Sequence, residues 1–202
     1  MDEQTRLIER VFVTQKELKE VPFPLLIKTT TGKEIIPLDS SNKADMILIE
    51  KITKSITSYL DISKRTKRRI RGDRINEVGK SIEVEFVQEL QRNGLEVNSL
   101  GSSGYPDIEI IDHVGRFTYL ESKSTSKSWE SSFRSFYYNT GKKVKENARH
   151  LLIGWRIIEE SDKYWIIKGC KLVDLFNLSL KLKAEFNASN NNIYKDSFYE
   201  VS

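Results

Sequence analysis

The sequence of 202 residues contains one cysteine, Cys170, and two histidines, His113 and His150. A single thiol excludes a disulfide framework and a zinc site built from several thiolates, and two imidazoles argue against a metal site built from histidine. No apolar run is long enough to span a membrane, and Met1-Asp2-Glu3 lacks the basic start of a signal peptide. The sequence also lacks a G-x-x-x-x-G-K-[ST] phosphate-binding loop. We therefore expect a cytoplasmic (intracellular) protein with no membrane partner and no nucleotide cofactor.

The rest of the composition is typical of a folded, heavily charged domain. Hydrophobic residues make up 38% of the chain and aromatic residues 10%, which is enough to build a buried core. Charged residues reach 31%, and 33 basic against 29 acidic side chains leave a net charge of +4. Because this excess is small, any binding to a polyanion depends on where the basic residues gather.

The spacing of apolar residues predicts the elements of the first 75 residues. One helix is expected over residues 2–20. Residues 26–36 are expected to form a hairpin around Thr31-Gly32-Lys33. A second helix is expected after an N-cap at Ser40 or Ser41. Together these elements predict an N-terminal, mostly helical extension of helix-hairpin-helix type.

The chain after residue 75 has the pattern of an α/β or α+β core. The predicted order is α-β-β-β-α-β-β-α, with helices at residues 76–93, 142–149 and 175–186 and strands at residues 95–97, 107–111, 117–123, 151–157 and 164–167. The run 151–157 is apolar enough to be a strand buried on both faces. The sequence therefore predicts a sheet with helices packed against it.

Two acidic residues are expected to face each other across a hairpin. His113-Val114-Gly115 supplies the turn between the second and third predicted strands. A hairpin centred on Val114 pairs residues whose numbers sum to 228, which sets Asp107 opposite Glu121. Lys123 returns to the same face because side chains alternate along a strand. Opposed residues have Cβ atoms about 5 Å apart, and two carboxylates placed in this way destabilise each other unless a cation or a proton intervenes.

Oxygen ligands of this kind suit a hard cation such as Mg²⁺, which keeps waters and binds substrate phosphate. Such an ion would polarise a phosphate and lower the pKa of a bound water, while Lys123 could position that water. These parts suit the hydrolysis of a phosphodiester. The alternative is that the three side chains are ordinary solvated charges at strand ends, and a register slip of one residue would separate them.

Pro106-Asp107, followed after thirteen residues by Glu121-Ser122-Lys123, resembles the signature of the PD-(D/E)XK nuclease superfamily. The segment from Gly79 to Glu83 looks like the helix that precedes the catalytic hairpin in these nucleases, and Ser102-Ser103-Gly104 is similar to the small-residue approach of their restriction-like members. The resemblance covers about residues 76–167. It implies a restriction-endonuclease-like core, which is a central mixed β-sheet flanked by helices.

The resemblance implies a role for each matching position. The implied catalytic residues are Asp107, Glu121, Lys123 and Glu83, and the implied metal ligands are Asp107, Glu121 and the backbone carbonyl of Ser122. Glu77 is a second candidate for the helix carboxylate, six residues earlier and nearly two turns away. The alternative for Glu83 is an exposed helix residue without a role. The implied cofactor is Mg²⁺.

The most basic stretch of the chain is Lys64–Arg74, which holds seven positive charges against one negative. Such a run could be a solvated helix face or a flexible connector, but it lies directly before the predicted helix of Glu83. Contacts from lysine and arginine to phosphate give most of the non-specific affinity for DNA. A second basic cluster follows at residues 142–149. The residues expected to bind DNA are Arg65, Lys67, Arg68, Arg69, Arg71, Arg74, Lys142 and Lys143.

Together these features predict a magnesium-dependent endonuclease acting on double-stranded DNA. Resemblance to type II restriction endonucleases favours sequence-specific cleavage within a restriction-modification system. Because each chain has one catalytic centre (cutting centre), cleavage of both DNA strands predicts a homodimer whose two-fold axis matches a palindromic site. The alternatives are a structure-specific nuclease, such as a Holliday junction resolvase or repair nuclease, and a DNA-binding protein without catalysis. The predicted parts are residues 1–75 for DNA contact and dimerisation, 76–170 as the catalytic core, and 171–202 as a C-terminal helix and tail packed on that core.

Overall fold

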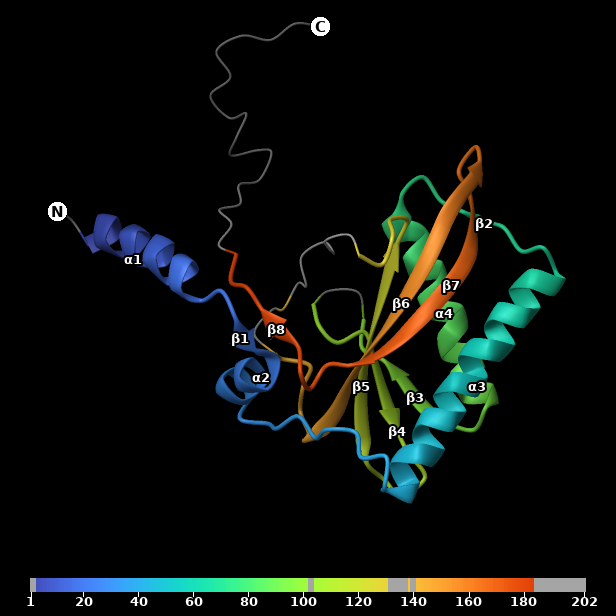
Figure 1. Cartoon of the computed structure of the whole chain (residues 1–202), viewed down its shortest axis with the longest axis horizontal. Coiled ribbons are helices and arrows are strands. Elements are labelled where there is room, and N and C mark those ends of the chain that lie inside the picture. Colours follow the sequence, from blue (N-terminus) through green and yellow to red (C-terminus); the bar gives the residue numbers. More distant parts are fainter. Residues whose placement is uncertain (1–2, 102–103, 131–137, 139–140, 184–202) are drawn as a thin grey trace, which may run out of the picture. The chain divides into compact units, whose positions relative to one another are not determined.

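The computed structural model describes residues 3–101, 104–130, 138 and 141–183 (Figure 1). The chain divides into two compact units, one formed by Met1–Pro22 and Ser179–Ser202 and the other by Phe23–Leu178. In the first unit, helix α1 (Glu3–Glu17) has no buried residue, and β1 (Val21–Pro22) pairs antiparallel with β8 (Ser179–Leu180). Helix α1 confirms the first predicted helix, which ends three residues earlier than expected.

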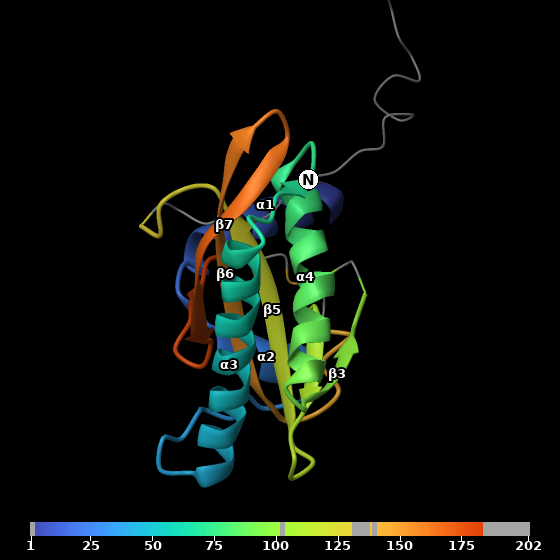
Figure 2. The ribbon, with the colours of Figure 1, turned by 90° about the vertical axis from the view of Figure 1, so that its right-hand side faces the viewer.

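The second unit is a six-stranded mixed sheet with two long helices side by side across one face (Figure 2). The strand order is β2-β7-β6-β5-β4-β3, and β5 and β6 are the parallel neighbours. The elements are α2 (Phe23–Thr31), α3 (Lys43–Arg65), β2 (Ile70–Arg71), α4 (Ile75–Arg92), β3 (Glu96–Ser99), β4 (Ile108–Ile111), β5 (Phe117–Thr125), β6 (Ala148–Ser161) and β7 (Tyr164–Asp174). This architecture confirms the predicted fold class. Within the described ranges, no helix combines the length and the hydropathy needed to cross a membrane.

An aromatic cluster joins the two helices to the sheet. Tyr59 of α3, Phe86 of α4 and Trp155 of β6 are buried and meet edge to face, with ring centroids 5.1–6.2 Å apart. Such pairs stabilise a core beyond the area that they bury. Helix α3 begins at an N-cap formed by Asn42, whose side chain accepts hydrogen bonds from two backbone N–H groups of the first turn. The predicted cap at Ser40 or Ser41 was therefore wrong by one or two residues.

The predicted hairpin over residues 26–36 is wrong, because this segment contains most of α2. Pro24 is compatible with a helix start, since its missing N–H group lies in the first turn. Phe23 and Ile27 are four residues apart and are both buried. Gly32 has a positive φ of 72° and donates its N–H group to a carbonyl of the last turn. A glycine in this conformation ends helices as well as forming hairpin turns, so the local signal was ambiguous.

Two predicted helices in the C-terminal half are also wrong. Residues 142–147 contain no helix but a turn followed by irregular chain, and β6 already begins at Ala148, before the apolar run. The burial of Arg149 and His150 inside that strand explains the error, because polar residues there do not look like strand interior. After β7, Asp174 accepts a hydrogen bond from the N–H group of Phe176, and a turn leads to β8. Phe186, at the end of the predicted last helix, lies outside the described residues.

A polar cluster is buried on the face of the sheet opposite α3 and α4. The His150 ring is fully buried, and its Nδ1 lies 2.6 Å from the hydroxyl oxygen of Tyr105. Its Nε2 has no hydrogen-bond partner among the described residues. Burial lowers the pKa of His150 to about 3, so the ring stays neutral in the folded protein over most of the acid range.

This depressed pKa predicts acid-sensitive folding. Between pH 6.5 and about 3 the unfolded chain binds a proton at His150 that the folded chain does not, so the free energy of unfolding falls as the pH falls. Replacing His150 by glutamine is expected to reduce this slope by about 1.4 kcal/mol per pH unit. Urea unfolding between pH 4.5 and 6.5 measures the slope, with His113→Gln in the exposed turn as the control. Equal slopes in wild type and His150→Gln would refute the expectation.

Candidate active site

The predicted register of the central hairpin is confirmed. Ile108 pairs with Leu120 and Glu109 with Tyr119, and the numbers of each pair sum to 228. Asp107 lies one position before β4, where this register continues to Glu121 on β5. The carboxylate of Asp107 accepts a hydrogen bond of 2.9 Å from the N–H group of Ser122, which ties it to the neighbouring strand.

Glu121 is a buried carboxyl group held between a carboxylate and an ammonium. Glu121 is only 2% exposed, and Lys123 Nζ lies 2.5 Å from Glu121 Oε1. Burial and the charge of Asp107 raise the pKa of Glu121 to about 7. Its Oε2 is buried and has no hydrogen-bond partner among the described residues. The alternative that these residues are solvated strand-end charges is therefore wrong for Glu121.

Helix α4 brings Glu83, and not Glu77, towards this pair. Glu83 is 6% exposed; burial raises its pKa, the Lys80 ammonium at 2.6 Å opposes the rise, and the charge of Asp107 adds to it. Glu77 accepts a hydrogen bond from the N–H group of Asp73 at the start of the helix, where it acts as a cap. The alternative that Glu83 is an exposed helix residue is wrong.

The other face of β5 is held by α4 and β6. Ser122 Oγ accepts a hydrogen bond of 3.2 Å from the Trp155 indole. Gly79 of α4 lies so close to this strand that a Cβ there would sit 3.0 Å from Ser124 Oγ. The glycine is therefore explained by close helix–strand packing, which fixes β5 from behind.

The donor atoms at the hairpin fit a hard divalent cation. In the part of the chain that the structure describes, no group of three or more His, Cys, Asp or Glu side chains is arranged to hold a metal ion. The available set is two carboxylates, from Asp107 and Glu121, to which the resemblance adds the carbonyl of Ser122. The unsatisfied Oε2 of Glu121 and the neighbouring carboxylate supply the negative charge that such an ion needs.

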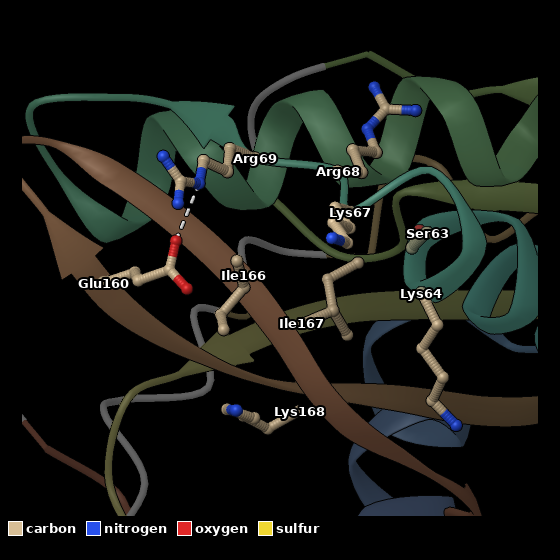
Figure 3. A pocket seen from close by; sticks show the side chains of 9 residues that line it. All are labelled: Ser63, Lys64, Lys67, Arg68, Arg69, Glu160, Ile166, Ile167 and Lys168. Carbon is tan, nitrogen blue, oxygen red and sulfur yellow. Dashed lines mark ion pairs between the residues drawn. The ribbon is translucent and has the colours of Figure 1, made fainter.

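The basic run borders a cavity of about 350 Å³ beside the edge of β7 (Figure 3). Arg69 Nε lies 2.7 Å from Glu160, and Arg68 pairs with Glu85, which also accepts a hydrogen bond from the Tyr59 hydroxyl. These two arginines are therefore compensated by carboxylates. Among the described residues no ion pair forms at the three lysines that line the cavity, which are Lys64, Lys67 and Lys168.

The remaining predicted DNA contacts lie at several places in the fold. Arg65 ends α3, Arg71 lies in β2, and Arg74 is the N-cap residue of α4. Lys142 is exposed in the connection before β6, whereas the neighbouring Lys143 is half-buried and donates to backbone carbonyls. The sequence carried no signal for the carbonyl partners of Lys143 or for the buried pair of Tyr105 and His150. The Ser102-Ser103 part of the small-residue approach lies outside the described residues.

Comparisons with known proteins show the family to which the chain is related. A family model described as the type II restriction enzyme MjaV family matches residues 16–197 of the chain. The type II restriction enzyme MjaV of Methanocaldococcus jannaschii is 32% identical over 200 aligned residues, which cover 88% of this chain and 86% of the relative. No solved structure matches the chain.

Proposed function

The chain belongs to the type II restriction enzyme MjaV family and is therefore a sequence-specific DNA endonuclease, and we propose that Asp107, Glu121 and Lys123 form its cutting centre with Mg²⁺. The observation that carries this proposal is the buried Glu121 carboxyl group on β5 beside the half-buried Asp107 carboxylate, one position before β4. Lys123, at 2.5 Å from Glu121, completes the set on the same strand face.

Type II restriction enzymes generally use a divalent metal ion. We propose that Asp107, Glu121 and the Ser122 carbonyl hold Mg²⁺, which when bound polarises the scissile phosphate and lowers the pKa of a bound water. The Lys123 ammonium lies beside these carboxylates, so it can orient the attacking water and stabilise the negative charge that develops on the phosphate. The water oxygen then bonds to phosphorus as the bond to the leaving oxygen breaks, and a proton of the water passes through the solvent to the leaving oxygen. Glu83 is proposed to support the site through its charge.

The DNA-binding surface is proposed to include Arg65, Lys67, Arg71, Arg74 and Lys142. Arg68 and Arg69 form ion pairs with Glu85 and Glu160, so we expect them to contribute less to DNA binding. A homodimer would place two cutting centres on the two strands of a palindromic site. Because a restriction enzyme acts on DNA within the cell, we propose an intracellular location.

Digestion of plasmid DNA tests the proposed function. In the presence of Mg²⁺ the protein is expected to produce discrete fragments, and EDTA is expected to prevent their formation. Sequencing the fragment ends would then give the recognition site. Intact plasmid with selective cutting of a four-way junction would instead indicate recognition of DNA shape.

The pairing of the basic residues predicts different outcomes for Lys67→Ala and Arg68→Ala. Lys67→Ala is expected to weaken DNA binding and to reduce the slope of log affinity against log salt concentration by about one, because it removes one phosphate contact. Arg68→Ala is expected to lower the free energy of unfolding by about 1–2 kcal/mol, because Glu85 loses its charged partner. Fluorescence anisotropy in a salt series and urea unfolding measure the two effects. If Arg68→Ala instead lowered the salt slope of DNA binding by about one and left the free energy of unfolding unchanged, Arg68 would be a phosphate contact and this expectation would be wrong.

A further inference from the structure

The side-chain ammonium of Lys143 donates hydrogen bonds to three backbone carbonyl groups. Its Nζ donates to the carbonyl oxygens of Gly101, Gly104 and Pro106 at 3.2, 2.8 and 3.0 Å. A lysine ammonium has three N–H donors and no acceptor, so three carbonyls use all of its donors. No donor remains for a DNA phosphate. Lys142, the next residue along the chain, is exposed.

The carbonyls belong to the loop that leads from β3 to the aspartate of the cutting centre. Asp107 lies before the first residue of β4, outside the regular hydrogen bonding of the strand. The N–H group of Leu100 donates to the carbonyl of Asp107 at 2.8 Å, which closes the loop at its base. Lys143 holds the carbonyl of Pro106, the residue immediately before Asp107. The position of Asp107 therefore depends on what holds this loop.

A second anchor holds the same loop from within the protein. Tyr105 is buried, its hydroxyl oxygen lies 2.6 Å from His150 Nδ1, and its ring stacks on the imidazole with centroids 5.7 Å apart. Phe23 of α2 packs edge to face against both rings. Tyr105 thus fixes the loop through its own side chain, whereas Lys143 fixes the loop through the backbone carbonyls of the loop.

We propose that Lys143 is a positioning residue for DNA cleavage, whose ammonium holds the backbone carbonyls of Gly101, Gly104 and Pro106 and thereby presents the Asp107 carboxylate to Glu121. The proposal rests on the cutting centre proposed above. It assigns the two adjacent lysines different roles, since Lys143 acts on the chemical step through Asp107, whereas Lys142 acts on DNA binding. Lys143 is a charged residue that supports the site without touching the substrate.

Steady-state cleavage of a DNA fragment carrying the mapped site tests this division. Lys143→Met is expected to lower kcat about 100-fold, because a small displacement of a catalytic group costs about that much. It is also expected to raise the Mg²⁺ concentration needed for half-maximal cleavage, with the KM for DNA within about twofold of wild type. Lys143→Arg, which can still donate to carbonyls, is expected to recover part of the kcat.

Two variants serve as comparisons. Lys142→Met is expected to raise the KM for DNA and to lower the salt slope of binding by about one. Lys54→Met removes the same charge from an exposed position of α3 and is expected to behave as wild type. If Lys143→Met instead shows the behaviour expected of Lys142→Met, with kcat preserved, Lys143 is a phosphate contact and the proposal is overturned.

Lysine acylation of the wild-type protein, read by mass spectrometry, tests the same contacts without a variant that must fold. With an N-hydroxysuccinimide ester of acetate as the probe, Lys142 is expected to react in free protein and to be protected by DNA. Lys143 is expected to be protected in both states. Reaction at Lys143 equal to that at Lys142 in free protein would overturn the proposal. An active Asp107→Asn variant would refute the cutting centre itself, whereas an inactive Asp107→Asn beside a Lys143→Met with wild-type kcat would refute this inference alone.

Discussion

Asp107→Asn is expected to lower the rate of DNA cleavage by about 10³-fold or more, because it removes one of two carboxylates available to a divalent ion. Asparagine has nearly the shape of aspartate, and its amide oxygen can still accept the hydrogen bond from Ser122. The fold is therefore expected to persist. The substitution also removes a negative charge that opposes ionisation of Glu121, so the melting temperature is expected to equal or exceed that of wild type.

Single-turnover cleavage of plasmid in Mg²⁺ measures the rate, and a gel shift without metal measures DNA binding, which is expected to remain. Glu109→Gln is the matched control, since Glu109 lies two residues further along the same hairpin and accepts a hydrogen bond from Asn98. It is expected to cleave at the wild-type rate. Cleavage by Asp107→Asn at that rate would mean that the cutting centre lies elsewhere in the chain.

Lys123→Met is expected to reduce cleavage by about 10³-fold while DNA binding persists. The methionine keeps much of the length of the side chain but removes the ammonium that lies 2.5 Å from Glu121. The attacking water and the developing phosphate charge both lose a cation in a site where burial makes charge interactions strong. The same cleavage and binding assays apply, with Lys54→Met as the control for loss of charge.

Two results would separate catalysis from folding in this variant. A melting temperature near that of wild type with cleavage lost is the outcome expected of a catalytic lysine. Wild-type cleavage by Lys123→Met would show that its ammonium only neutralises Glu121, and the proposed role of Lys123 would be abandoned.

The central hairpin could be predicted because its signals are local and agree with one another. The turn at Val114 and the alternation of apolar residues define one register, and β4 and β5 pair without an irregularity. The same reasoning would fail for β6 and β7, whose register shifts between Arg156 and Ile157 and again further on. The resemblance implied a role for Glu83 through its spacing from Gly79 and Phe86 along one helix, which is also a local property.

The remaining features depend on partners far away in the sequence. Gly32 ends a helix in a conformation that hairpin turns also use, and only the burial of Phe23 and Ile27 separates the two outcomes. Lys143 bonds to carbonyls about 40 residues earlier, and a carbonyl is present at every residue, so no side-chain pattern marks its partners. Arg68 looked like a DNA contact because its carboxylate partner, Glu85, lies on another element.

The position of β5 between two paired strands has a consequence for how the gene can change. Hydrogen bonds to β4 on one side and β6 on the other fix its register, so the strand cannot slide to absorb a lost or added residue. An in-frame deletion of one codon between Phe117 and Glu121 would turn the catalytic side chains of β5 towards α4 and bring the side chains of Ser122 and Ser124 into the site. In this strand, amino-acid substitutions are therefore tolerated far more readily than insertions or deletions of residues.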